Sequence, residues 1–263
     1  MAFTVCVLAS GSAGNCTYIA SEETALLIDA GLSHKELARR LDQIGVSPDR
    51  LCAVCLTHEH GDHTTGLRVL HRRQGLKLYA NAGTVEAMER DPDHRDLKWN
   101  VFATGSPFPI GDLRIEPFSV PHDAYDPVGF VVSHGNRRVG IVTDMGMATE
   151  LIRQRLRHCQ MLVLESNHDE KMVTDAKRPW ALKQRVLGRQ GHLSNRGAAA
   201  LIGEVAGPQL SAVYLAHLSA ECNRPELAQE TAAAALRELG FSQVRLCLTF
   251  PDRISEVWQA VDG

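Results

Sequence analysis

The sequence lacks the features that mark membrane, secreted and polybasic proteins. No stretch approaches the roughly 20 apolar residues that a membrane helix needs, and residues 1–8 lack the charged start and long apolar run of a signal peptide. The seven cysteines are an odd number with irregular spacing, which does not indicate a disulfide framework. The net charge of -3 excludes a chain that is polybasic as a whole. We therefore expect a cytoplasmic protein with reduced thiols and no membrane association.

The 263 residues also contain no repeat, low-complexity tract or linker, so we expect one domain over residues 1–263. Short apolar runs predict strands, and segments with helical periodicity predict helices. The expected strands cover residues 3–9, 16–20, 25–28, 52–56, 77–80, 161–164, 213–216 and 244–250, with several antiparallel strands within 101–142. The expected helices cover a segment that ends at Gly45 and residues 66–73, 84–89, 179–187, 196–205 and 225–239. This alternation is typical of a layered α/β domain.

Three imidazoles and one carboxylate follow the predicted strand 52–56 within six residues. They are His58, His60, Asp62 and His63. Nitrogen and carboxylate ligands at this spacing suit a borderline divalent ion such as zinc. We expect them in a loop in which Gly61 lets the backbone fold tightly. A solvated polar turn is the alternative, and four ligand-type residues so close together argue against it.

Three further ligand-type side chains follow predicted strands. His122 comes after residues 118–120, Asp144 after residues 140–143 and His217 after residues 213–216. Active-site groups commonly gather at such positions. Each residue alone has an ordinary structural alternative, but together with the first cluster they form a set.

This order of motifs, from Asp29 at a strand end to His217, resembles that of the metallo-β-lactamase superfamily over essentially the whole chain. The resemblance implies a four-layer αββα sandwich with two divalent ions, Zn or Mn, at one edge of two packed sheets. The implied ligands are His58, His60 and His122 for one ion, Asp62, His63 and His217 for the other, and Asp144 between the two. It also implies that Asp29 fixes the loop that carries the first ligands.

The chemistry expected of such a centre follows from its charges. Two cations lower the pKa of a bridging water, so that hydroxide is available near neutral pH. They also stabilise negative charge on the attacked centre. We expect Asp62 to bind the second ion and to orient the nucleophile. Esters, thioesters, amides and phosphodiesters all remain possible substrates, because the metals alone do not choose among them.

One more histidine, His192, lies 25 residues before His217. In the phosphodiesterase branches of the superfamily, such as RNase Z and PhnP-like enzymes, an extra histidine precedes the last metal ligand, and His192 resembles that residue. The resemblance implies a general acid or a contact to the scissile phosphate. The alternative is a helix N-terminus capped by Ser194 or Asn195. Both interpretations are compatible, because a helix N-terminus also favours phosphate, and Ser194 and Asn195 are therefore candidate substrate contacts as well.

Residues 176–203 contain no acidic side chain and six basic ones. This local excess beside His192 favours a polyanionic substrate, with Lys183, Arg185 and Arg189 as phosphate contacts and Trp180 as a stacking platform for a base. A merely solvated charged face is the alternative.

Four separated motifs, at residues 9–15, 165–169, 191–195 and 217–223, resemble the YycJ/WalJ subfamily more closely. That resemblance implies a nuclease that degrades double-stranded DNA from 5′ to 3′, with a role in mismatch repair. It places Ser10, Ser12 and Asn15 near the metals as candidate substrate contacts. His168 is either a substrate contact or a structural hydrogen-bonding residue. Cys222 departs from the pattern, because subfamily members tend to have asparagine there.

Other functions remain open at this point. A small-molecule hydrolase of the thioesterase or lactonase type, or an RNA or cyclic-nucleotide phosphodiesterase, has the same metals, although a small-molecule hydrolase needs neither His192 nor the basic segment. A flavo-diiron oxidoreductase commonly has glutamate where this chain has His60, and it needs a flavin domain for which there is no room. Non-catalytic relatives lose ligands, whereas all seven implied ligands are present here.

Overall fold

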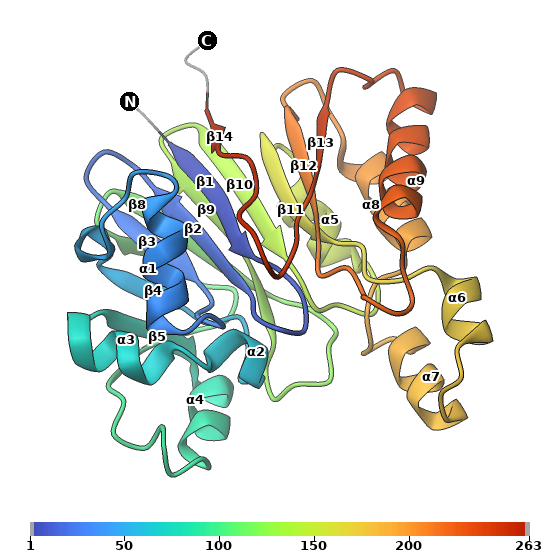
Figure 1. Cartoon of the computed structure of the whole chain (residues 1–263). Helices are drawn as coiled ribbons and strands as arrows, with labels where there is room; N and C mark the ends of the chain where they lie inside the picture. Colours follow the sequence, from blue (N-terminus) through green and yellow to red (C-terminus); the bar gives the residue numbers. More distant parts are fainter. Residues whose placement is uncertain (1–2, 261–263) are drawn as a thin grey trace.

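The computed structural model describes residues 3–260, in which two seven-stranded sheets pack face to face (Figure 1). The first sheet has the order β14-β1-β2-β3-β4-β5-β6 and the second the order β13-β12-β11-β10-β9-β8-β7. The first contains β1 (Thr4–Ala9), β2 (Cys16–Ala20), β3 (Ala25–Ile28), β4 (Ala53–Cys55), β5 (Lys77–Asn81), β6 (Trp99–Phe102) and β14 (Trp258–Gln259). The second contains β7 (Phe108–Ile110), β8 (Leu113–Ser119), β9 (Val128–His134), β10 (Arg137–Val142), β11 (Met161–Glu165), β12 (Ala212–Ala216) and β13 (Arg245–Leu248).

Helices cover the outer face of each sheet, as Figure 1 shows for α1 and α3 on one side and α8 and α9 on the other. The helices are α1 (His34–Asp42), α2 (Gly61–Thr64), α3 (Leu67–Gln74), α4 (Ala82–Glu89), α5 (Glu150–Leu156), α6 (Glu170–Asp175), α7 (Trp180–Leu187), α8 (Asn195–Val205) and α9 (Pro225–Glu238), with a 3-10 turn at Pro48–Arg50. Within residues 3–260, no helix is both long and apolar enough to cross a membrane.

Three apolar layers account for the stacking. The central layer joins the two sheets and includes Val5 and Val7 of β1. The alternate residues of the same strand, Cys6 and Leu8, belong to the layer under α1 and α3. A third layer packs the second sheet against α5, α8 and α9. Because both faces of each sheet are buried, the strands are nearly continuous apolar runs. The predicted αββα sandwich is confirmed.

Most predicted elements are present within one or two residues of their expected bounds. The region after residue 101 contains the antiparallel strands β7 to β10, but β6 pairs in parallel with β5 in the other sheet. Three helices, α2, α5 and α6, were not predicted. Their brevity explains this, since α5 buries only Ile152 and Leu156, and α6 only Val173. One or two apolar positions do not produce a recognisable helical period.

The loops that hold the first ligands are locked together by backbone hydrogen bonds. Asn15 donates to the carbonyl of Asp62 at 2.7 Å, Gly31 donates to Asn15 at 2.9 Å, and Ala30 donates to His63 at 2.7 Å. A Cβ atom on Gly31 would lie 1.8 Å from the Asp62 carbonyl oxygen. The expected tight loop at Gly61 is wrong, because Gly61 begins α2 and a Cβ atom there would meet nothing within 4 Å. The close approach belongs to Gly31 instead.

These two glycines make a matched pair for a stability test. We expect Gly31→Ala to lower the free energy of unfolding by about 1–3 kcal/mol, because the backbone must move away from the new methyl group. Gly61→Ala should change it little. Urea unfolding of both variants and the unchanged protein measures the difference, and equal stabilities for the two variants would contradict this account of the loop.

Candidate active site

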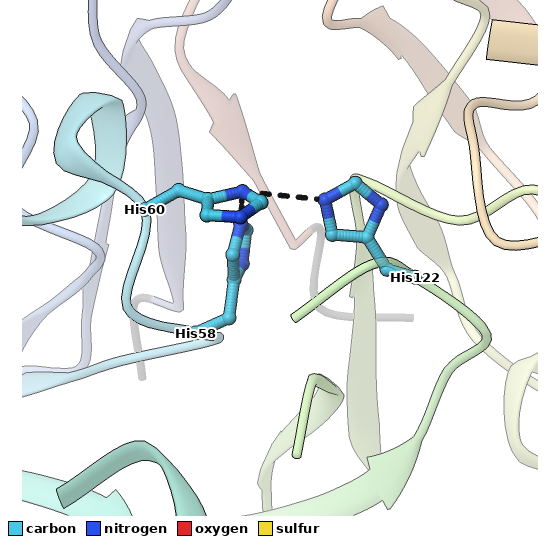
Figure 2. Close-up of side chains that lie close together, drawn as sticks. All are labelled: His58, His60 and His122. Carbon is cyan, nitrogen blue, oxygen red and sulfur yellow. Dashed lines mark hydrogen bonds between the residues drawn. The ribbon is translucent and has the colours of Figure 1, made fainter. Parts of the chain in front are cut away.

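Three histidine nitrogens converge where β4 and β8 end (Figure 2). His60 Nδ1 lies 3.1 Å from His58 Nε2 and 3.4 Å from His122 Nε2. The opposite nitrogens of two of these rings are already engaged, His58 Nδ1 with Thr57 Oγ1 at 2.9 Å and His122 Nδ1 with the Gly191 carbonyl at 3.1 Å. A ring whose Nδ1–H donates to oxygen leaves its Nε2 lone pair free for a cation.

A second group of ligand atoms lies next to the first. His63 Nε2 is 3.2 Å from Asp144 Oδ2 and 3.5 Å from Asp62 Oδ2, and His217 Nε2 is 3.7 Å from the same Asp62 oxygen. The other oxygen of Asp144 lies 3.9 Å from His122 Nε2. The Asp144 carboxylate therefore lies between the two groups.

Two atoms of this second group show that the residues fit divalent cations. Asp144 Oδ2 and His217 Nε2 are buried and have no hydrogen-bond partner among the described residues. Buried polar atoms are rarely left without a partner, and a carboxylate oxygen beside imidazole nitrogens is the ligand type that zinc and similar ions take. These atoms are placed as ligands of a bound ion would be.

The imidazoles and carboxylates of the cluster shift one another's pKa values. Burial opposes the charged form of His63, but Asp29 and Asp144 outweigh it and raise the pKa of His63 well above its usual value. Burial likewise opposes charge on Asp144, and the neighbouring His217 and His63 lower the pKa of this carboxyl well below its usual value. Protonated histidine cannot bind a cation through the protonated nitrogen, so a metal must displace that proton.

The backbone at three strand ends is twisted into a rare conformation. Asp29, Asp144 and His217 have φ angles of 62°, 53° and 56° and follow β3, β10 and β12. L-amino acids seldom adopt positive φ, which costs about 1–3 kcal/mol for each residue. Apart from glycine, the only other described residue with positive φ is His158. The strain is therefore concentrated where side chains must turn from the strand towards the site.

Asp29 and Glu165 hold the ligands from behind. Asp29 is 2% exposed, accepts from the Thr57 backbone at 2.8 Å and contacts His63 Nδ1 at 2.8 Å. Glu165 is completely buried, and its Oε1 accepts from His192 Nδ1 at 2.8 Å and His217 Nδ1 at 3.0 Å. Its Oε2 accepts from the backbone N–H groups of Met145 and Leu193.

Sequence reasoning assigned no role to Glu165. The available signal was an acidic residue directly after an apolar predicted strand, a position like that of Asp29 after residues 25–28. Burial would raise the pKa of Glu165, but His192 and the hydrogen bonds from His192 and His217 lower it to about 2. The carboxylate therefore stays charged and fixes Nδ1 as the donor in both rings.

Three of the residues expected to touch substrate are buried and bonded within the protein. The Ser10 hydroxyl accepts from the His217 backbone at 2.7 Å, and Asn15 Nδ2 lies 3.1 Å from Asp62 Oδ2. Asn195 Oδ1 accepts from Ser166 at 2.7 Å. We assign these three residues to positioning the site rather than to substrate contact. Ser12, in contrast, is exposed in the loop before β2.

The capping interpretation of Ser194 matches the structure. Its hydroxyl accepts from the Gly197 backbone at 3.1 Å at the start of α8 and donates to Glu170 at 2.9 Å. His168 is 1% exposed, and its Nδ1 lies 3.4 Å from Asn167 Oδ1. His192 lies at the rim, 22% exposed, whereas the side chains of His122 and His217 are 1% and 4% exposed.

The basic segment, residues 176–203, contains α7 and most of α8, and α7 projects with α6 from the sandwich at the lower right of Figure 1. Acidic residues elsewhere in the chain neutralise part of it. Arg185 pairs with Asp123, and the other pairs are Arg178 with Glu221 and Arg196 with Glu170. Lys183 donates to the Thr174 carbonyl. Arg189 is exposed and has no ion pair within residues 3–260, and Trp180 is 61% exposed. Composition within the segment does not reveal such distant partners.

Comparison with known proteins agrees with this geometry. A family model described as the beta-lactamase superfamily domain matches residues 24–217. The chain belongs to the metallo-β-lactamase superfamily. It is a metal-dependent hydrolase, and the resemblance found in its motifs is confirmed.

Individual relatives cover nearly the whole chain. Exodeoxyribonuclease YycJ of Bacillus anthracis is 37% identical over 237 residues, which is 89% of both proteins. Exodeoxyribonuclease WalJ of Streptococcus pneumoniae is 36% identical over 232 residues, covering 87% of this chain and 86% of the relative. The metallo-beta-lactamase fold protein YhfI from Bacillus subtilis has a similar crystal structure, with a TM-score of 0.73 at 18% identity over 98% of this chain and 99% of that one.

The role of Glu165 leads to a prediction for the variant Glu165→Gln. Each carboxylate oxygen of Glu165 accepts from two N–H groups. In the glutamine variant one of these oxygens becomes an NH₂ group, which cannot accept, so in either orientation of the side-chain amide two donors lose their acceptor. We expect the free energy of unfolding to fall by about 1–3 kcal/mol and the metal content to decrease, because His217 loses its anchor. Glu150→Gln, at an exposed carboxylate of α5, is the control. Unchanged stability and metal content in Glu165→Gln would refute this role.

Proposed function

We propose that this protein is a dinuclear metal-dependent phosphodiesterase that removes nucleotides from the 5′ ends of double-stranded DNA. The observation that carries the proposal is His192, a rim histidine that the two ligand groups do not need. Its ring centroid lies 5.2 Å from that of His122 and 5.1 Å from that of His217. The names of the two exodeoxyribonuclease relatives support DNA as the substrate.

Each group of residues has a part in this reaction. When bound, the two ions supply an activated water and stabilise charge on the phosphate. His58, His60 and His122 would hold one ion and Asp62, His63 and His217 the other, with Asp144 beside both groups. Asp62 would also orient the attacking water. His192 has Nδ1 occupied by Glu165, so Nε2 is the nitrogen that faces the substrate.

The proton transfer follows from this arrangement. As the P–O3′ bond breaks and an oxygen from water adds to phosphorus, His192 protonates the departing O3′. Burial lowers the pKa of His192, but the Glu165 carboxylate outweighs it and raises that pKa, which keeps the proton available. An alkoxide is a poor leaving group, so this proton matters more for DNA than for activated esters.

Fewer basic residues are free to contact the DNA backbone than the composition of the segment indicates, because three of its arginines are paired with carboxylates. Arg189, whose backbone lies beside Gly146, is an exposed basic residue after α7 with no ion pair within residues 3–260. Lys183, Ser12 and Trp180 are further candidate contacts. Arg185 is also a candidate phosphate contact, but it is paired with Asp123, the residue after His122. Arg185 must break this ion pair before its guanidinium can bind a phosphate. We propose that the protein acts in the cytoplasm, in DNA repair.

A labelled-end assay tests the proposed function. Duplex and single-stranded DNA and RNA, labelled at the 5′ or the 3′ end, are incubated with protein loaded with Mn²⁺ or Zn²⁺. We expect duplex DNA to lose its 5′ label first as mononucleotide, and chelation to abolish the release. Preferred cleavage of RNA, initial loss of the 3′ label, or faster hydrolysis of a thioester than of DNA would contradict the proposal.

His192→Ala separates a nuclease from a general hydrolase. We expect both ions and the fold to be retained, while DNA cleavage falls by about 10²–10⁴-fold, the usual contribution of a general acid. Hydrolysis of bis-p-nitrophenyl phosphate should fall much less, because its leaving group needs little protonation. Loss of an ion would instead make His192 a ligand, and full DNA cleavage would remove it from the mechanism.

A further inference from the structure

A pocket of about 320 Å³ opens beside His192, where residues 146–148, α5 and the first turns of α8 meet. Its size lies at the lower end of the range of about 300–1,000 Å³ that is typical of small-molecule sites. His192 is the residue that the pocket shares with the candidate active site. No residue of the ligand set lines it, so it is a separate compartment that adjoins the candidate active site at His192.

About half of the pocket lining is apolar and half is polar. Met147, Leu187, Leu193, Ala200 and Leu201 supply hydrocarbon surface, which favours a flat, weakly polar group over a strongly hydrated one. His168 adds an imidazole in the wall, and within residues 3–260 its Nε2 makes no hydrogen bond. Burial lowers the pKa of His168, so its neutral ring offers one donor and one acceptor.

The charges of the lining argue against a phosphate-binding site. Glu170 and Glu204 both line the pocket, and Arg153 is already paired with Glu204. Glu170 also accepts a hydrogen bond from the hydroxyl of Ser194, the residue that caps α8. A phosphate placed here would face two carboxylates and compete for one engaged guanidinium. A nucleobase, in contrast, has aromatic faces for the apolar wall and edges that bond to imidazole.

The position of the pocket identifies which nucleotide would enter it. When the P–O3′ bond breaks, O3′ leaves with the nucleotide on the 5′ side of the scissile phosphate. His192, which donates the proton to O3′, is also a wall of the pocket. We propose that this pocket receives the base and sugar of the departing 5′-terminal nucleotide, with His168 against the base; this inference rests on the proposed function. The 5′-phosphate of that nucleotide stays at the pocket mouth.

A binding experiment on metal-loaded protein tests this assignment without relying on turnover. The probes are 2′-deoxyadenosine, 2′-deoxyadenosine 5′-monophosphate and inorganic phosphate, titrated by calorimetry. Ala200→Phe fills the pocket from an exposed helix position, and Met147→Trp fills it from the loop before α5. Gln229→Phe, which adds the same ring to an exposed position of α9 outside the pocket, is the matched control.

We expect the nucleoside and the nucleotide to bind with similar affinity, and inorganic phosphate not to displace the nucleoside. Either filling variant should weaken nucleoside binding by at least about tenfold, while Gln229→Phe leaves it unchanged. His168→Ala should weaken it as well. Nucleoside binding that is absent, or equal in the filling variants and the unchanged protein, would overturn the assignment. Displacement of the nucleoside by inorganic phosphate would overturn the recognition of the base.

The outcomes also separate this inference from the proposed function. If the labelled-end assay shows no release of nucleotide while deoxyadenosine still binds and is blocked by Ala200→Phe, the proposed nuclease reaction fails and the nucleoside site stands. If release from DNA occurs but a 5′-terminal abasic residue is removed with the same KM as a normal nucleotide, the nuclease stands and the pocket assignment fails.

Discussion

A carboxylate buried away from water is costly unless cations or N–H groups surround it, and this chain buries Asp29, Asp144 and Glu165 at one edge of its sandwich. Each is compensated by imidazoles or backbone amides within the same cluster. The arrangement of the surrounding loops follows from this requirement. Positive φ angles at Asp29, Asp144 and His217 turn these side chains from the strand ends into the cluster. The close approach at Gly31 packs the neighbouring loop against Asp62, whose carboxylate accepts from the buried Asn15.

Each sheet supplies part of the candidate site at this edge. β3 and β4 of the first sheet bring Asp29 and the residues from His58 to His63, while β10, β11 and β12 of the second bring Asp144, Glu165 and His217. A centre built from both sheets depends on their packing, so the apolar layer between them also fixes the distances between ligand atoms. Glu165 links this centre to His192, and His192 in turn lines the pocket beside α8.

The sequence predicts the fold well, because strands and helices follow local rules, and the candidate ligands that it indicates lie close together in the structure. A buried strand is a recognisable apolar run, and a ligand-type residue just after such a run lies at the sheet edge. The residues behind the ligands do not follow local rules. Ser10 meets His217 across 207 positions of sequence, and Glu165 meets His192 and His217 across 27 and 52.

Such partners depend on the tertiary fold, and no spacing in the chain reveals them. The same reason explains why the ion pairs of the basic segment were not predicted. Its arginines pair with carboxylates on α6, after β8 and after β12. Local composition predicted a free cationic surface, but the fold neutralises much of it. Exposed residues without an ion pair among the described residues, such as Arg189, are therefore better guides to the path of a polyanion than the total count of basic residues.

The central claim is that the cluster from His58 to His217 holds two divalent ions. Anomalous diffraction from crystals grown with Mn²⁺, recorded above and below the manganese absorption edge, tests it most directly. The account predicts two peaks, one among His58, His60 and His122 and one among Asp62, His63 and His217, with Asp144 next to both. A single peak, or a peak coordinated by His192 in place of His217, would contradict it.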